Sequence, residues 1–267
     1  MHLMNDQQYM TIAMAQAAKA ARLGEVPIGS AVVAKRPSVT QYSRIPLAEQ
    51  EALLRAYEFL AAGAVQVGGV AVRADLAERL AADLAEGLAS GAVSPGERLD
   101  SSADPASAKE EAPQPSDGLA ETPDELVISL GYNRRELDVD PAGHAEFLAL
   151  KEASAALGVW RLPNCVVYVT LEPCIMCAGL MHQARVGGCV FGAFDPKAGA
   201  LGSLYRIHED SRLNHEFSVT GGVLEQECAK MMKDFFAKRR KENKERKRAA
   251  AQQAALAADD KRSSLER

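Results

Sequence analysis

The sequence predicts an α/β fold, and two kinds of segment lead to this prediction. Short runs rich in β-branched residues, such as Ile28 to Ala34 and Cys165 to Thr170, are typical of buried strands. Between such runs lie segments with apolar residues at every third or fourth position, which favour helices. Strands separated by helices imply a largely parallel or mixed sheet with helices on both faces. The composition, 47% hydrophobic and 25% charged, is ordinary for one globular core with an appendage.

One predicted hairpin is interrupted by a long segment. The strand Ile28 to Ala34 has its natural partner in Leu126 to Leu130, whereas hairpin loops are normally only about two to five residues long. Residues 36–124 are therefore predicted to be an insertion in a domain that consists of residues 1–35 and 125–248.

The other elements are justified by the same periodicities. They are expected in the order helix to Ala21, helix His144 to Leu157, strand Cys165 to Thr170, helix Pro173 to Ala184, strand Cys189 to Ala193, short strand Phe217 to Thr220 and a long helix from Leu224. Within the insertion, residues 47–89 contain two helical periods and are predicted to form a helical hairpin. Residues 90–123 have almost no aliphatic bulk and are predicted to be disordered. Residues 249–267 are expected to form a frayed C-terminal tail.

Charge is divided unevenly along the chain, although the net charge is only −5. Residues 36–124 hold seven basic and fifteen acidic residues, so this part should repel polyanions. Residues 230–248 hold ten basic and three acidic residues, so this part should attract them.

The chain shows no targeting signal, and no segment approaches the roughly 18 apolar residues of a membrane span. We therefore expect a cytoplasmic protein without a membrane partner. The cysteine count is odd, and Cys165, Cys189 and Cys228 lie in strand-like or helix-like runs. We interpret these three as reduced core residues.

The segment that organises the chemistry is the end of the strand at residues 165–170, where the chain runs into Pro173-Cys174-Ile175-Met176-Cys177. We expect Pro173 at the first helical position and both sulfurs in the first turn. There the helix dipole favours thiolate, the form that binds zinc. The C-x-x-C pattern alone would also suit a redox pair or half of a structural zinc knuckle. A catalytic zinc site needs a third protein ligand.

The best third ligand is His144, which opens an apolar helical segment two residues before Glu146. In mid-helix, residues two apart point in nearly opposite directions. Both side chains can therefore serve one centre only if His144 lies at the helix entrance, as Pro141 and Gly143 before it suggest. His144 would then bind the metal and Glu146 its water. Two other histidines, His182 and His208, are interpreted as surface or core residues.

The pattern H-x-E followed by P-C-x-x-C resembles the signature of zinc-dependent nucleobase deaminases. Further blocks resemble the bacterial tRNA adenosine deaminases: Glu25-Val26-Pro27-Ile28-Gly29, Val169 to Cys174, Asp195 to Ala200, Asn214-His215 and Asp234-Phe235-Phe236. The resemblance implies a three-layer α/β/α sandwich of the cytidine-deaminase type with a mixed five-stranded sheet, and a homodimer. It implies one Zn²⁺ per chain on His144, Cys174 and Cys177, with Glu146 as the proton shuttle. The chain departs from the family pattern at Ala142-Gly143 and Phe194, which predicts a looser helix entrance and altered packing beside the substrate loop.

The resemblance also implies substrate contacts by Asn133, Asp195, Lys197 and Asn214. Asn133 could otherwise be a turn residue, and Lys197 a solvated loop residue. Two adjacent aromatic residues cannot both face one core, so Phe236 is predicted to offer a base a stacking surface. The basic run that starts at residue 238, with Arg239 and Arg240, is predicted to meet phosphates rather than to be only a solvated helix face.

Together these features predict hydrolytic deamination of adenosine to inosine at the wobble position of a tRNA anticodon, with the anticodon stem-loop as the partner. One alternative is a deaminase of a free cytosine or guanine compound, which would have no use for a basic tail. Another is a non-catalytic RNA-binding module with a structural zinc, for which Glu146 would be superfluous.

Overall fold

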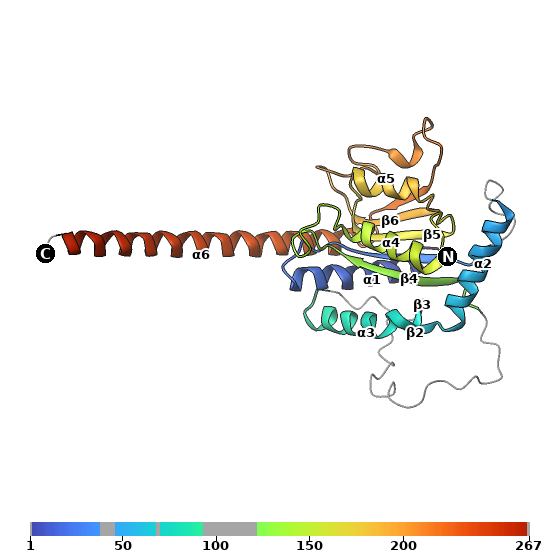
Figure 1. Ribbon diagram of the computed structural model, residues 1–267, viewed down its shortest axis with the longest axis horizontal. Coiled ribbons are helices and arrows are strands. Elements are labelled where there is room, and N and C mark those ends of the chain that lie inside the picture. The colour runs from blue at the N-terminus through green and yellow to red at the C-terminus, as the bar shows by residue number, and fades with distance from the viewer. Residues whose placement is uncertain (1, 38–45, 68–69, 93–121, 266–267) are drawn as a thin grey trace, which may run out of the picture.

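The computed structural model describes residues 2–37, 46–67, 70–92 and 122–265, and it shows one sheet between two layers of helices (Figure 1). The helices are α1 (His2–Arg22), α2 (Leu47–Ala62), α3 (Ala74–Ala89), α4 (Ala145–Leu157), α5 (Ile175–Gln183), the short 3-10 helix η2 (Ile207–Glu209) and α6 (Glu225–Leu265). The strands are β1 (Gly29–Lys35), β2 (Val65–Val67), β3 (Val70–Val72), β4 (Glu125–Tyr132), β5 (Cys165–Leu171), β6 (Gly188–Ala193) and β7 (Ser218–Gly221). The disorder predicted for residues 90–123 falls almost entirely on residues outside the described ranges.

The described strands form one mixed sheet in the order β2-β3-β4-β1-β5-β6-β7. Strand β1 is antiparallel to both β4 and β5, whereas β5, β6 and β7 run parallel. Gly29 lies opposite Tyr132 and Lys35 opposite Glu125, which confirms the interrupted hairpin. The start of β1 and the ends of β4, β5, β6 and β7 therefore lie at one edge of the sheet, which we name the C-terminal edge.

Each face of the sheet has its own hydrophobic core. Helices α2, α4 and α5 cover one face, where Tyr57, Leu150 and Met181 are buried. Helices α1, α3 and the start of α6 cover the other, where Met10 and Leu80 are fully buried. The three-layer α/β/α sandwich is thereby confirmed. The sheet has seven described strands rather than the expected five, because the insertion adds β2 and β3 to it.

The insertion is not a helical hairpin, and that prediction was wrong. Its described helices, α2 and α3, lie on opposite faces of the sheet, and β2 and β3 stand between them in the chain. Strand β3 lies along the free side of β4, where Val72 lies opposite Val127 in a parallel register. Three β-branched or small residues beside an unpaired sheet edge are more stable as a strand than as the first turn of a helix.

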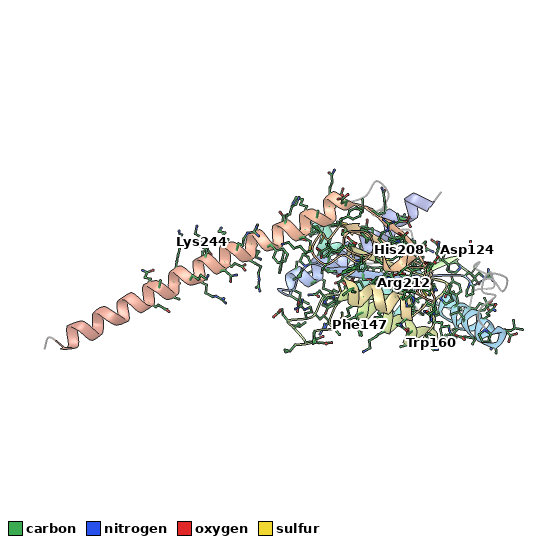
Figure 2. The ribbon with its side chains drawn as sticks, turned by 90° about the horizontal axis from the view of Figure 1, so that it is seen from above. Asp124, Phe147, Trp160, His208, Arg212 and Lys244 are labelled. Carbon is green, nitrogen blue, oxygen red and sulfur yellow. The ribbon has the colours of Figure 1, made fainter. Side chains whose placement is uncertain are left out.

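Within the described residues, helix α6 continues without a break to Leu265, where we expected a frayed tail from residue 249. The alanine-rich stretch after Arg248 extends an existing helix, which requires no new nucleation. Figures 1 and 2 show this helix projecting far beyond the rest of the molecule, with Lys244 on the projecting part. None of the helices in the described ranges is long and apolar enough to cross a membrane.

Candidate active site

The two cysteines of the predicted ligand set lie where β5 leads into α5, at the C-terminal edge. Cys174 is the N-cap of α5 with an extended backbone (φ −72°, ψ 172°), and Cys177 is the third residue of the helix. Pro173 therefore precedes the N-cap and does not occupy the first helical position, contrary to our prediction. The cause is local: Ala200 donates a backbone hydrogen bond to Pro173 (2.8 Å), and Cys174 bridges to Gly199, which keeps the chain extended through Cys174.

The predicted histidine ligand lies at the start of another helix, α4. His144 is the extended N-cap of α4 (φ −82°, ψ 146°), and Glu146 is the second residue of that helix with only 3% of its surface exposed. The predicted entrance position of His144 is thereby confirmed. Gly131 of β4 allows the start of α4 to lie close against this strand, because a side chain at Gly131 would overlap the carbonyl oxygen of Ala145.

The donor atoms of the three residues have the spacing of a metal site. His144 Nδ1 lies 3.6 Å from the Sγ of Cys174 and 3.6 Å from the Sγ of Cys177, and all three atoms lie within 4.8 Å of one another. A tetrahedral zinc ion with Zn–S bonds of about 2.3 Å and Zn–N bonds of about 2.1 Å would place sulfur and nitrogen roughly 3.6 Å apart. The three residues therefore fit a zinc ion and could bind a metal.

The protonation of the site follows from burial and close neighbours. Contact with the Cys177 thiol and the His144 ring lowers the pKa of Cys174 to about 3, whereas the same contact and burial raise the pKa of Cys177. Burial raises the pKa of Glu146 to about 7, against the opposing effect of a backbone hydrogen bond and His144. A carboxyl group with a pKa near neutrality can both accept and donate a proton.

The other three cysteines are free and buried, as predicted for core residues. Burial raises the pKa of Cys228 to about 12 and that of Cys165 and Cys189 as well, which makes these thiols inert. His182 and His208 are also buried and lie outside the ligand group.

The loop with Asp195 and Lys197 is fixed against this site by Glu172, whose role the sequence did not reveal. The Glu172 carboxylate is almost fully buried and accepts backbone hydrogen bonds from Asp195 (3.0 Å), Leu201 (3.1 Å) and Ser203 (2.9 Å). The Ser203 hydroxyl donates a further one. Lys197 itself is exposed, and its backbone N–H donates to the Asp195 carboxylate. The structure thus brings Asp195 and Lys197 to the side of Cys174.

Asn133 lies directly after β4, also at the C-terminal edge, and it is 97% buried. Its amide donates to Glu25 Oε2 (2.8 Å), and Glu25 Oε1 accepts the backbone N–H of Leu137 (2.5 Å). Glu25 is itself 1% exposed, so Asn133 is held by a buried partner. This contact could not be predicted from the sequence, because the two residues are 108 positions apart.

The remaining predicted residues are more scattered. Asn214 is exposed and precedes β7, whose start pairs with the start of β6. It therefore lies at the edge opposite Cys174, and the structure does not bring it to the site. Phe236, Arg239 and Arg240 are exposed on α6, which begins at the C-terminal edge after β7.

The two departures from the family pattern are accommodated locally. Gly143 does not loosen the helix entrance, because its carbonyl accepts a hydrogen bond from Arg134 (2.8 Å) and its N–H donates to Asp140 (3.0 Å). Phe194 is half-exposed and packs edge-on against Phe191, with ring centres 5.0 Å apart.

Comparison with known proteins gives concordant matches. The model of the MafB19-like deaminase family matches residues 103–240. A tRNA-specific adenosine deaminase of Bacillus subtilis is 48% identical over 110 residues, which are 41% of this chain and 68% of that protein. One of Haemophilus influenzae is 43% identical over 112 residues, 42% of this chain and 65% of that protein, so the match spans about two thirds of these relatives.

A solved structure from a study of A-to-I editing by tRNA:A34 deaminases covers 84% of this chain and 98% of its own, with a TM-score of 0.47 and 23% identity. The family model covers more than half of the chain, and the B. subtilis relative is 48% identical over about two thirds of its own length. The chain therefore belongs to the MafB19-like deaminase family and is a relative of the tRNA-specific adenosine deaminases.

Proposed function

We propose that this protein hydrolytically deaminates adenosine to inosine at the wobble position of a tRNA anticodon. The observation that carries the proposal is the meeting of His144, Cys174 and Cys177 with the buried carboxyl group of Glu146. A structural metal site needs no buried general base beside it. The choice of adenosine and tRNA is supported by the names of the relatives.

The residues divide the work between binding and proton transfer. One zinc ion held by His144, Cys174 and Cys177 would supply Lewis-acid activation of a water molecule. Glu146 accepts a proton from that water as the water oxygen adds to the ring carbon that bears the amine. The same carboxyl group then gives a proton to the amine, which leaves as ammonia.

The target base must leave its stack to reach Glu146, and an anticodon loop allows this at low cost. Asn133 and the loop with Asp195 and Lys197, which Glu172 holds, are proposed to contact the target nucleotide. Phe236 is proposed to stack on a base. The basic side chains of α6 from Arg239 onward are proposed to contact phosphates of the anticodon stem.

The proposal also includes the cellular compartment and the oligomeric state. Five free cysteines suit a reducing compartment, and we place the protein in the cytoplasm. A homodimer is proposed from the family resemblance, and sedimentation of the purified protein checks it.

The direct test is to incubate the purified protein with unmodified tRNA and to measure inosine in nuclease digests by mass spectrometry. We expect inosine at position 34 of at least one tRNA, and none after the zinc is removed by a chelator. Release of ammonia from free cytosine or guanine compounds, without inosine in tRNA, would support the small-molecule alternative instead.

A further inference from the structure

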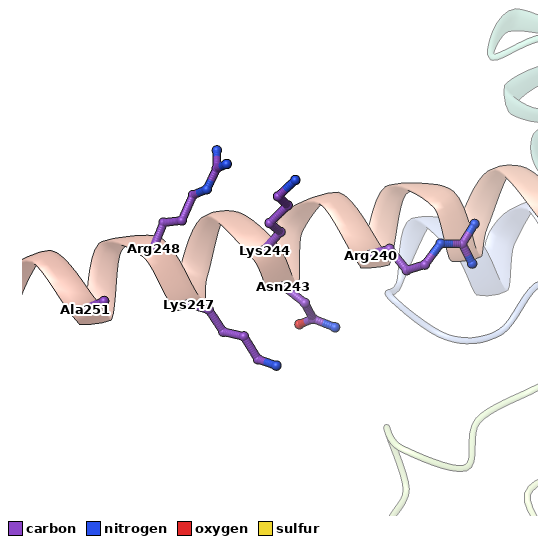
Figure 3. Close-up of a pocket in the computed structure, with 6 residues that line it drawn as sticks. All are labelled: Arg240, Asn243, Lys244, Lys247, Arg248 and Ala251. Carbon is purple, nitrogen blue, oxygen red and sulfur yellow. The ribbon is translucent and has the colours of Figure 1, made fainter.

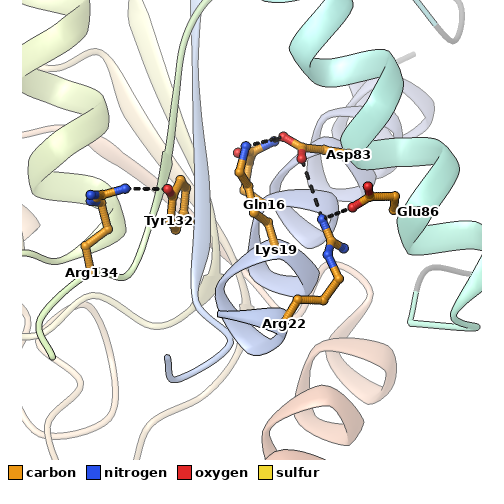
Figure 4. A network of polar contacts seen from close by, with 7 residues as sticks. All are labelled: Gln16, Lys19, Arg22, Asp83, Glu86, Tyr132 and Arg134. Carbon is orange, nitrogen blue, oxygen red and sulfur yellow. Dashed lines mark hydrogen bonds and ion pairs between the residues drawn. The ribbon is translucent and has the colours of Figure 1, made fainter. Parts of the chain in front are cut away.

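A continuous row of polar and aromatic contacts connects the insertion with the loop that leads into His144 (Figure 4). We propose that Asp83, in helix α3 of the insertion, is a positioning residue for substrate binding. It acts through Lys19 and Tyr132 on the loop of residues 134–143. The proposal rests on the proposed function and extends it to the part of the chain that interrupts the hairpin.

The first step is the contact between α3 and α1. Asp83 is 5% exposed, and its Oδ2 accepts hydrogen bonds from Gln16 Nε2 (3.0 Å) and Lys19 Nζ (3.1 Å). Arg22 lies 3.6 Å from the other oxygen. A buried carboxylate is stable only with such partners, and in return it holds the flexible Lys19 ammonium group in one position.

The second step is the contact between α1 and the end of β4. Lys19 Nζ lies 5.3 Å from the centre of the Tyr132 ring, within the range of a cation–π interaction. The guanidinium carbon of Arg134 lies 5.2 Å from the same ring, and Arg134 also donates a hydrogen bond to the Tyr132 hydroxyl. Figure 4 shows Tyr132 between Arg134 and the residues of α1. Lys19 and Arg134 both lie against the Tyr132 ring. Because Asp83 holds Lys19 in place, Lys19 restricts where the guanidinium group of Arg134 can lie.

The third step reaches the loop itself. Arg134 donates two hydrogen bonds to the Asp138 carboxylate (2.7 and 2.8 Å), and its backbone N–H donates to Gly143 (2.8 Å). The loop therefore closes on Arg134 at both its middle and its end. Asn133, the proposed nucleotide contact, lies between Tyr132 and Arg134 in the chain, so a shift of either neighbour moves it.

A simpler role for Asp83 would be to fasten α3 onto α1. Glu86 does only that: it is exposed and lies 2.5 Å from Arg22, which also lies near Asp83, but it has no contact with Lys19 among the described interactions. Glu86→Gln is therefore a matched control that weakens the interface without changing the contact between Asp83 and Lys19.

The test uses full-length, zinc-loaded protein and two measurements. Hydrogen exchange of peptides covering residues 134–143, without substrate, reports the loop; kcat and KM on an anticodon stem-loop RNA report its effect. We expect Asp83→Asn and Lys19→Met to speed loop exchange and to raise KM, each roughly two- to fivefold, the range of one cation–π contact. The kcat should stay within about twofold, because the zinc ligands and Glu146 keep their own contacts. Glu86→Gln should change neither loop exchange nor KM.

The coupling through Tyr132 gives the decisive comparison. In a Tyr132→Leu background the ring is absent, so adding Asp83→Asn should have no further effect on loop exchange or KM. Equal effects in both backgrounds, or unchanged exchange in Asp83→Asn and Lys19→Met despite lower melting temperatures, would show that Asp83 only fastens two helices. If the wild-type protein formed no inosine, the proposed function would fail, whereas the exchange measurement would still decide the role of Asp83.

Discussion

Single residues divide the proposed active site into metal ligands and a proton carrier. His144, Cys174 and Cys177 meet through their donor atoms, while Glu146 lies outside this ligand group. The two tasks should therefore be separable by substitution.

We expect Glu146→Gln to retain zinc and to lose at least about a thousandfold in kcat, because the amide cannot carry the proton while its shape still fits the buried site. Cys177→Ser should lose both zinc and activity, since it removes a thiolate ligand. Zinc content by mass spectrometry and inosine formation are measured on the same samples. Glu51→Gln, on the exposed side of α2, is the control and should change neither. An active Glu146→Gln protein would contradict the mechanism.

The grouping of His144, Cys174 and Cys177 could be predicted from the sequence because each belongs to a short motif at a helix entrance. The residues that support them could not. Glu25 and Asn133 are 108 positions apart, and Glu172 meets Ser203 across 31. Neither motif periodicity nor spacing carries information about such contacts, which depend on how the strands are ordered in the sheet.

Glu172 should be important for the stability of the loop with Asp195 and Lys197. Burial opposes its ionisation, but hydrogen bonds from the Ser203 side chain and from backbone N–H groups outweigh burial and hold the pKa of Glu172 below its ordinary value of 4.5. Its stabilising effect is therefore present above pH 4.5 and is lost as the pH falls through the lowered pKa.

Glu172→Gln leaves one acceptor oxygen for four donors, and we expect it to lower the free energy of unfolding by about 2 kcal/mol at pH 7. The difference from wild type should shrink as the pH falls through the lowered pKa of Glu172, where the wild-type carboxylate also becomes protonated. Urea unfolding at several pH values measures it, with exposed Glu216→Gln as the control. A difference that is independent of pH would show that charge is not the cause.

At the level of elements, the sequence predicted five of the described strands, including the short β7, and it missed β2 and β3. Strands β2 and β3 have three residues each, too few to show an alternation. Their strand conformation comes from the free side of β4, which is a tertiary effect. We propose that residues 1–35 and 125–248 form the deaminase domain and that α2, β2, β3 and α3 are built into it.

A pair of leucines in α3 tests whether the insertion is part of the core. Leu80 is fully buried between α3 and α1, whereas Leu88 in the same helix is 38% exposed. Leu80→Ala should therefore lower the free energy of unfolding by about 2–5 kcal/mol, and Leu88→Ala by less than about 1 kcal/mol. Both should shift one cooperative transition in urea. A separate early transition affected by Leu80→Ala alone would identify the insertion as an independent accessory.

On the scale of the whole molecule, most of the basic run lies on the part of α6 that projects beyond the domain. Helix α6 begins at the C-terminal edge, where the site lies, and carries the basic run away from the domain. Figure 3 shows the side chains of Arg240, Lys244, Lys247 and Arg248 on successive turns of α6, all of them exposed. The charge division was predictable from composition, but the length of the arm was not, because an extended helix and a frayed tail share one alanine-rich sequence.

The arm gives a prediction that separates RNA from small-molecule substrates. If its cations meet phosphates, each contact releases condensed counterions, with a logarithmic slope of about 0.7 per contact for single-stranded RNA. Lys244→Gln together with Lys247→Gln should remove two contacts. Between about 50 and 200 mM salt, the affinity for an anticodon stem-loop should fall in both proteins. The fall should be roughly sevenfold larger for the wild type than for this variant.

The matched control removes two cations of the same helix that already have acidic partners. Lys230 lies 2.6 Å from Asp234, and Lys238 lies 3.9 Å from Glu242. Lys230→Gln with Lys238→Gln changes the net charge by the same amount as the arm variant, but it should alter the salt slope less, because paired cations hold fewer phosphate contacts. Fluorescence anisotropy with a labelled stem-loop measures both slopes. Equal slopes in the wild type and the arm variant would mean that the basic side chains of α6 are only a solvated helix surface. An equal reduction of the slope in the arm variant and the control variant would mean that net charge, not the position of the arm, attracts the RNA.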